Sequence, residues 1–177
     1  MKFKRIYEKL NQSYDYSSLQ IDFSDPIKEL VISTGNKIPC HALYTEGEKY
    51  GREDEIHCTI LYGIHTSKAK DVRQLMSLIS PFTITLRDIS FFNSDNHNVM
   101  KIDIESPKLM QINKFVRDNL EHTDTFPEYH PHCTIAYVIK GTSVPVDPSM
   151  FNGMTVKITN VTFSNKNGSH EKITLRI

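Results

Sequence analysis

The chain has 177 residues, of which 38% are hydrophobic, so it can bury one packed core but is too short for two independent domains of ordinary size. Lys and Arg together number 21, as do Asp and Glu, and this balance excludes the positive field by which proteins grip long nucleic acids. The charged start lacks the apolar run of a signal peptide, no window approaches a membrane span, and three cysteines without a CxxC pair indicate reduced thiols. We expect a monomeric cytoplasmic protein in which residues 1–177 form a single domain, with neither a membrane nor a long nucleic acid as partner.

The first predicted element is a short helix over residues 24–35. Pro26 stands where a first helical residue belongs, and Gly35 stands where a left-handed residue ends many helices. After this helix, residues 46–55 are polar, highly charged and bounded by glycine, which predicts a solvated loop. This loop is where we expect any segment that closes over a ligand.

Strands and one helix follow the loop. The segment IHCTILYGI predicts a strand, and residues 66–81 repeat apolar residues at helical spacing until Pro81 ends the run. Residues 82–92 and 99–106 then read as strands, because apolar and polar residues alternate in them.

The last third of the chain repeats this order. Ser106 and Pro107 open a second helix with an apolar stripe, and the segment YHPHCTIAYVI predicts the strand that follows it. At the carboxyl end, MTVKITNVTFS and EKITLRI alternate around an Asn-Gly turn, which is typical of a hairpin. The pattern predicts an α+β fold of two lobes related by a pseudo-twofold axis, with two antiparallel sheets facing across a central cleft and helices on the flanks.

The tetrapeptide His-Cys-Thr-Ile occurs once in each of the two predicted motif strands. Successive side chains of a strand point to opposite faces, so each copy presents an imidazole and a hydroxyl side by side, with Cys and Ile turned inward. The same parity puts Tyr62 and Tyr137 on the inward face, as core residues. The two polar pairs are His57 with Thr59 and His132 with Thr134.

Two such pairs facing each other fit the chemistry of a phosphodiester. One imidazole can deprotonate a nucleophile while the other protonates the leaving oxygen, since a histidine with a pKa of about 6.5 serves in either form at neutral pH. Each threonine can donate a hydrogen bond to a nonbridging oxygen of the phosphate. This chemistry needs no cofactor and no metal, so we predict His57, His132, Thr59 and Thr134 as catalytic residues.

Four further residues are candidates for substrate binding. Tyr16 and Tyr44 flank segments that lead toward the first motif and are suited to form an aromatic platform for a nucleobase in the cleft. Arg52 can pair with a phosphate or serve as a surface charge, and Glu171 follows the last turn and can close over the ligand.

A zinc site is the competing interpretation of the His and Cys residues around the second motif. Adjacent His and Cys side chains on a strand diverge, and neither CxxC nor HExxH is present, so we predict no metal. His130 shares the parity of His132, but Pro131 separates them, and we expect the His130 side chain in solvent.

The two HxT motifs, one per half of the chain, resemble those of the 2H phosphoesterase superfamily. The resemblance in layout runs from about Tyr16 to the carboxyl terminus, and it implies a bilobal enzyme that cleaves nucleotide phosphodiesters without a metal. The second motif has the Pro131-His132 step common in that superfamily, whereas Ile56 replaces the proline before the first.

The segments SSLQIDF and GREDEIHCTILYG are similar to the phage-encoded branch of the superfamily that includes anti-CBASS nucleases. This similarity implies a small cyclic oligonucleotide with 3′,5′ linkages as the substrate. Two other functions remain open: processing of RNA ends that carry 2′,3′-cyclic or 2′,5′ linkages, and a sponge that binds a cyclic nucleotide without cutting it.

Overall fold

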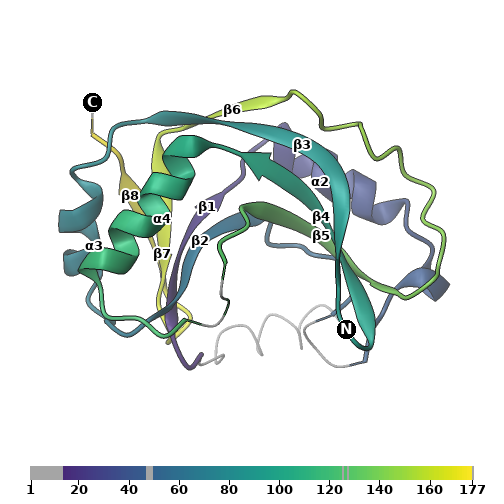
Figure 1. Cartoon of the computed structure of the whole chain (residues 1–177), viewed down its shortest axis with the longest axis horizontal. Coiled ribbons are helices and arrows are strands. Elements are labelled where there is room, and N and C mark those ends of the chain that lie inside the picture. Colours follow the sequence, from purple (N-terminus) through teal and green to yellow (C-terminus); the bar gives the residue numbers. More distant parts are fainter. Residues whose placement is uncertain (1–13, 47–49, 125, 127, 177) are drawn as a thin grey trace.

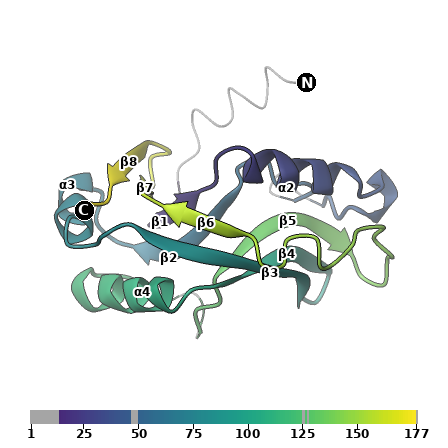
Figure 2. The same cartoon turned by 90° about the horizontal axis from the view of Figure 1, so that it is seen from above.

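The computed structural model describes residues 14–46, 50–124, 126 and 128–176, in which two four-stranded antiparallel sheets form an arch (Figure 1). Helices lie on the flanks of the sheets (Figure 2), and this arrangement confirms the predicted α+β class and its two sheets. Among the described residues, no helix is long and apolar enough to cross a membrane.

The first sheet, here called lobe 1, has the strand order β2-β1-β7-β8. Its strands are β1 (Ser17–Asp22), β2 (His57–Ile64), β7 (Asn160–Ser164) and β8 (His170–Thr174). The second sheet, lobe 2, has the order β5-β4-β3-β6. Its strands are β3 (Phe82–Asn93), β4 (His97–Glu105), β5 (His132–Ile139) and β6 (Thr155–Ile158). The two motif strands, β2 and β5, therefore occupy equivalent edges of the two sheets.

The lobes do not correspond to the two halves of the chain. The run MTVKITNVTFS, which alternates like one strand, is divided at Thr159: β6 pairs with β3 in lobe 2, and β7 pairs with β1 in lobe 1. The predicted hairpin is formed by β7 and β8, and the main-chain N–H of Asn165 donates to the carbonyl of Ser169 at 2.8 Å. The carboxyl-terminal residues thus complete the amino-terminal sheet.

The helices cross between lobes in the same way. Three α-helices, α2 (Ile27–Asn36), α3 (Ala69–Met76) and α4 (Pro107–Asn119), and a short 3₁₀ turn, η1 (Cys40–Ala42), lie in the described part of the chain. α4, from the second half of the chain, packs on β2, while α2, from the first half, packs on β5. As predicted, α4 starts at Pro107, and the Ser106 hydroxyl caps it by accepting from the Leu109 N–H at 3.2 Å.

The end of α2 differs from the prediction. Gly35 is not left-handed but lies inside the helix, where it is buried against Ile135 of β5. A Cβ at this position would lie 3.6 Å from Ile135, an ordinary van der Waals distance, so Gly35 neither ends the helix nor is required by the packing of the helix on the sheet.

Candidate active site

His57 and His132 are the first residues of β2 and β5, and both are half-buried where the two lobes meet. The strands touch reciprocally here, since the Cys58 thiol contacts the backbone of His132 and the Cys133 thiol contacts the backbone of His57. Burial raises the pKa of Cys58 to about 12 and also raises the pKa of Cys133. Both thiols therefore stay protonated and pack as small neutral side chains at the junction of the lobes. The two cysteines thereby hold the two histidines next to each other.

Both imidazoles make the same local contact. His57 Nδ1 lies 2.5 Å from the carbonyl oxygen of Glu55, and His132 Nδ1 lies 2.6 Å from that of His130. A carbonyl only accepts, so Nδ1 carries the proton in each ring and Nε2 is left for chemistry. The contact is identical although Ile56 precedes one histidine and Pro131 the other, so the missing proline does not alter the first motif.

A bulge in each motif strand changes which side chains share a face. In the pairing of β2 with β1, Thr59 stands opposite Gln20 and Leu61 opposite Leu19, so Ile60 is the extra residue. β5 has the same irregularity at Ile135. Ile60 and Ile135 are buried together with the residues that follow them, and strand parity reverses beyond each bulge.

The prediction that Tyr62 and Tyr137 belong to the core is therefore wrong. After the bulges, both tyrosines join the face that carries the HxT pairs, which we call the motif face, and both are half-buried. The parity rule assumes a regular strand, and a single inserted residue inverts it.

Neighbouring strands complete the motif face of lobe 1 with neutral polar groups around one carboxylate. Asp22, opposite His57, accepts from Gln20 Nε2 at 2.7 Å and from Thr162 Oγ1 at 2.5 Å. Gln20, opposite Thr59, and Thr162 are both buried. The carboxylate is thus satisfied by two neutral donors.

In lobe 2 the equivalent positions carry a buried cation. Lys101 stands opposite Thr134, where lobe 1 has Gln20, and only 5% of its surface is exposed. Its ammonium group pairs with Asp103, donates to Ser90 Oγ at 2.6 Å, and lies 4.2 Å from the centre of the Phe92 ring. Lys101 was not predicted as a site residue, although its position among alternating apolar residues did place it on the polar face of β4.

The pKa of His132 is lowered from its usual value. Burial is the largest cause of the lowering, and the hydrogen bond to the His130 carbonyl opposes it. The positive charge of Lys101 and the nearby His57 lower the pKa further, while Asp103 raises it. His132 is therefore held as a neutral imidazole at neutral pH. The Phe92 ring, 4.9 Å away and nearly perpendicular, packs its edge against it.

Aromatic rings collect at the far end of the motif face in each lobe. In lobe 1, Tyr16 stacks on His65 with ring centres 5.5 Å apart and meets Tyr62 edge-on at 6.0 Å. We call this set the lobe 1 ring cluster: Tyr16, Tyr62 and His65. The predicted ligand-binding residue Tyr16 thus lies beside the first motif strand.

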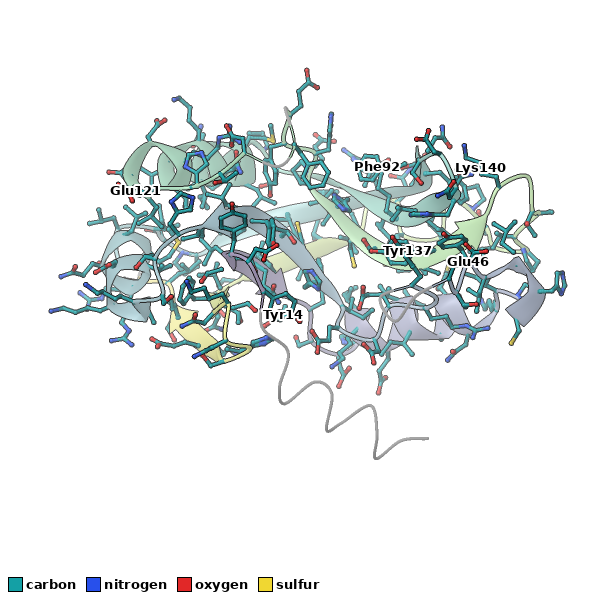
Figure 3. The ribbon with its side chains drawn as sticks, turned by 90° about the horizontal axis from the view of Figure 1, so that it is seen from below. Tyr14, Glu46, Phe92, Glu121, Tyr137 and Lys140 are labelled. Atoms are coloured by element: carbon teal, nitrogen blue, oxygen red, sulfur yellow. The ribbon has the colours of Figure 1, made fainter. Side chains whose placement is uncertain are left out.

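In lobe 2, the lobe 2 ring cluster consists of Tyr44, Tyr50, His97 and Tyr137. Tyr44 stacks on His97 with ring centres 4.7 Å apart, and Tyr50 meets Tyr137 edge-on at 5.0 Å. Figure 3, seen from below, shows Tyr137 and Phe92 on the lobe 2 side, whereas Tyr14 and Glu121 lie on the lobe 1 side. The structure therefore brings Tyr44 to the second motif strand rather than the first.

Arg52 and Glu171, the other two candidates, have structural partners. Arg52 donates to the carbonyl oxygens of Gly35 at 2.9 Å and Ile38 at 2.5 Å, so its charge ties the end of α2 to the segment that lies along β5. Glu171 stands opposite the core residue Phe163 and forms an ion pair with Arg73 of α3. It therefore faces the helix side of the sheet, away from the motif face, and we do not retain either residue as a ligand contact.

His130 lies at the rim with 61% of its side chain exposed, 3.3 Å from Glu128, in agreement with the expected solvent position. Within the described ranges, no group of three or more His, Cys, Asp and Glu side chains has an arrangement that could hold a metal ion. Of the segment expected to close over a ligand, residues 47–49 lie outside the described residues.

The site thus has the composition of a paired-histidine phosphoesterase: two imidazoles whose Nε2 atoms have no hydrogen-bond partner in the described part of the chain, each beside a threonine on the motif face. Residues 46–151, more than half of the chain and including both motifs, match the 2′-5′ RNA ligase superfamily. The chain belongs to this superfamily, the 2H phosphoesterases, whose members are phosphodiesterases.

Solved structures agree in fold. The protein TT0787 of Thermus thermophilus superposes with a TM-score of 0.67 at 16% identity, over 91% of this chain and 98% of that one. LigT of E. coli in complex with 3′-AMP gives 0.61 at 23% identity, over 93% and 95% of the two chains. Usb1 of Kluyveromyces marxianus with uridine monophosphate gives 0.58 at 10% identity, over 91% and 99%. No curated protein sequence matches the chain.

Proposed function

We propose that this protein cleaves 3′,5′ phosphodiester bonds of small cyclic oligonucleotides without a metal, with His57 and His132 as acid and base. The observation that carries the proposal is the matched state of the two histidines. Each binds a carbonyl through Nδ1, and no described residue forms a hydrogen bond with either Nε2. Two imidazoles prepared in this way can exchange protons with a substrate held between them.

The first step would be attack by a ribose 2′-OH on the neighbouring phosphorus. We propose that His132 accepts the hydroxyl proton, because burial and Lys101 keep it neutral, and that His57 donates a proton to the departing 5′-oxygen. The products are a 5′-hydroxyl and a 2′,3′-cyclic phosphate. Water can then open that ring with the two roles reversed, which restores both histidines.

The threonines would hold the nonbridging oxygens. Neither the Thr59 nor the Thr134 hydroxyl forms a side-chain hydrogen bond with another described residue, so both are available as donors. Lys101, behind Thr134, adds positive charge on the same side.

A small ligand is favoured by charge. Positive and negative residues balance at 21 each, so the chain lacks the excess of basic residues that tracking along an RNA strand requires. Together with the resemblance to the phage branch, this balance supports the proposal that the substrate is a cyclic messenger of bacterial CBASS immunity, and that its removal lets a phage evade the response.

The experiment is incubation of the purified protein, in excess chelator, with cyclic dinucleotides, a cyclic trinucleotide and a linear RNA ending in a 2′,3′-cyclic phosphate, followed by mass spectrometry. We expect opening of the cyclic nucleotides, slowed roughly 10²–10⁴-fold in His57→Ala and in His132→Ala. Processing of the RNA end alone would reassign the protein to RNA repair. Tight binding of cyclic nucleotides without cleavage would make it a sponge, and loss of activity in chelator would contradict the metal-free mechanism.

A further inference from the structure

The two ring clusters occupy equivalent places in the two lobes. Tyr62 and Tyr137 are each the third residue after the motif threonine, beyond a bulge, so each ring lies roughly 7–10 Å along its strand from the threonine hydroxyl. A ribose joins a phosphate to its base over a similar span. Because β2 and β5 meet at their histidines, the clusters lie on opposite sides of the proposed phosphate position.

The partners of the two tyrosines correspond only in part between the lobes. Tyr16, immediately before β1, and His97, the first residue of β4, lie at equivalent places beside the motif strands, whereas His65 follows β2 and Tyr44 and Tyr50 come from the segment along β5. A duplicated fold accounts for the two tyrosines and for the placement of Tyr16 and His97, but not for the recruitment of the further rings, His65 in lobe 1 and Tyr44 and Tyr50 in lobe 2. A shared ligand chemistry does account for it.

The lobe 2 ring cluster also carries a cost that packing alone would avoid. His97 Nδ1 is buried without a hydrogen-bond partner among the described residues, and its imidazole contacts three tyrosine rings. An unsatisfied buried nitrogen is unfavourable, so a ring chosen only for packing would be apolar. All four rings remain half-buried rather than fully enclosed.

We propose that the lobe 2 ring cluster is a nucleobase platform and that, with the lobe 1 ring cluster, it holds two bases on either side of the phosphate between the histidines. The ligand is therefore a dinucleotide unit with both bases bound, and a mononucleotide fills only one platform. This inference rests on the proposed function, because it places the scissile phosphate at the histidine pair. Aromatic stacking of this kind tolerates any base, since every base has a π-face.

The test is calorimetric binding of a cyclic dinucleotide whose two sugars lack the 2′-OH, which removes the nucleophile and separates binding from turnover. Tyr44→Leu and Tyr16→Leu keep apolar bulk but lose the ring, and we expect each to weaken binding roughly 5- to 150-fold, equivalent to about 1–3 kcal/mol per stacked base. Tyr44→Phe should bind within about twofold of the wild type. Binding of adenosine 3′-monophosphate should respond to only one of the two Leu variants.

The matched control is Phe91→Leu, because Phe91 is 44% exposed and lies on the opposite face of β3 from Phe92. Equal weakening by Phe91→Leu, or unchanged dinucleotide binding in Tyr44→Leu with a native circular dichroism spectrum, would overturn the two-platform inference. Failure of the proposed function would look different: ring-dependent binding of the deoxy ligand would persist while the ribose form remained uncut.

Discussion

Lys101 distinguishes the two halves of an otherwise symmetrical site. Its counterpart Gln20 is neutral, and the cation helps to lower the pKa of His132. If His132 is the base, activity rises with pH as His132 loses its proton, so the acid limb of kcat/KM should lie below pH 6.5 in the wild type.

Replacement of the cation, Lys101→Gln, should therefore raise the pKa of His132 and move the acid limb to higher pH. Loss of Lys101 also frees Asp103, whose charge acts in the same direction. NMR titration of the His132 ring, beside the pH dependence of kcat/KM, measures both. Lys114→Gln, at a 77% exposed position of α4 where the lysine pairs with Asp118, makes the same charge change in solvent and should shift neither. An unchanged pKa of His132 in Lys101→Gln would contradict the electrostatic role of Lys101.

The threonine hydroxyls should matter to the rate more than to stability. Thr59→Val and Thr134→Val keep shape and favour strands, but each removes a donor to the phosphate. We expect kcat to fall roughly 10²–10³-fold in each, as for loss of one oxyanion donor. Single-turnover rates and urea unfolding measure the two effects. A rate within threefold of the wild type in either variant would remove that threonine from the catalytic set.

At the scale of elements, the bulge of β2 is held by a helix of the other half of the chain. Asn113 of α4 is buried and donates from Nδ2 to the carbonyl of Ile60, the bulged residue, at 2.6 Å. Asn113→Ala leaves that carbonyl buried without this donor, so we expect a loss of about 1–3 kcal/mol in the free energy of unfolding. It should also weaken substrate binding through Tyr62.

The same helix supplies the control for this prediction. Asn119 donates to the carbonyl of Phe115 at 2.8 Å but is exposed, and Asn119→Ala should cost less than about 0.5 kcal/mol. Urea unfolding compares the pair. Equal losses of unfolding free energy in the two variants would show that the hydrogen bond to the bulge contributes no more than an exposed one.

Gly63 tests a second support of β2. It has φ +96°, and a Cβ there would lie 2.1 Å from the carbonyl oxygen of Thr123, whose N–H donates to Gly63 at 2.9 Å. Gly63→Ala must therefore displace the segment that runs along the edge of β2 and supplies a hydrogen bond to His65. Gly141, at φ +75°, has nothing within 4 Å of such a Cβ.

Gly141→Ala should thus show the conformational cost alone, about 1–2 kcal/mol, while Gly63→Ala should exceed it clearly, because a backbone clash is added. Thermal unfolding of the two variants gives the comparison. Similar losses of stability in the two variants would mean that the segment containing Thr123 shifts without an energetic cost.

The limits of sequence reasoning also lie at this scale. The HxT pairs, the cap of α4 and the Asn-Gly hairpin were predictable, because each depends on residues close in sequence. The local sequence does not reveal the bulges, because Ile60 and Ile135 are ordinary strand residues. Only the pairing of β2 with β1 and of β5 with β4 shows that one residue is extra. The faces of Tyr62 and Tyr137 followed from that pairing.

The contacts of Lys101 and Arg52 could not be predicted for the same reason, because they depend on how distant segments pair. The alternation of apolar and polar residues placed Lys101 on the polar face of β4, but its position opposite Thr134 depends on the register between β4 and β5. Arg52 read as a surface charge or a phosphate ligand, whereas its partners are carbonyls at the end of α2, brought near by packing of that helix on β5.

In the whole molecule, successive strands change lobe twice, between β2 and β3 and between β6 and β7. Lobe 1 needs β7 and β8 from the carboxyl end, and each motif strand is covered by a helix from the other half of the chain. Neither half can bury its own sheet, so the lobes should unfold together. This also explains how two weakly similar halves keep their histidines in one site: the motif strands share one core through Cys58 and Cys133.

The three cysteines provide a direct test of this coupling. Cys40 is exposed, while Cys58 and Cys133 are buried at the junction, with their thiol pKa values raised by burial. Brief alkylation at increasing urea, read by mass spectrometry, should therefore show one label on the native protein and three on the unfolded protein. If the lobes unfold as one unit, the change from one to three should coincide with loss of the circular dichroism signal, without a populated species that carries two. Cys40→Ser should shift the counts to none and two at the same urea concentration. A third label gained before the sheets melt would show instead that the junction opens while the lobes stay folded, and that the histidine pair is held by a contact weaker than the lobes it joins.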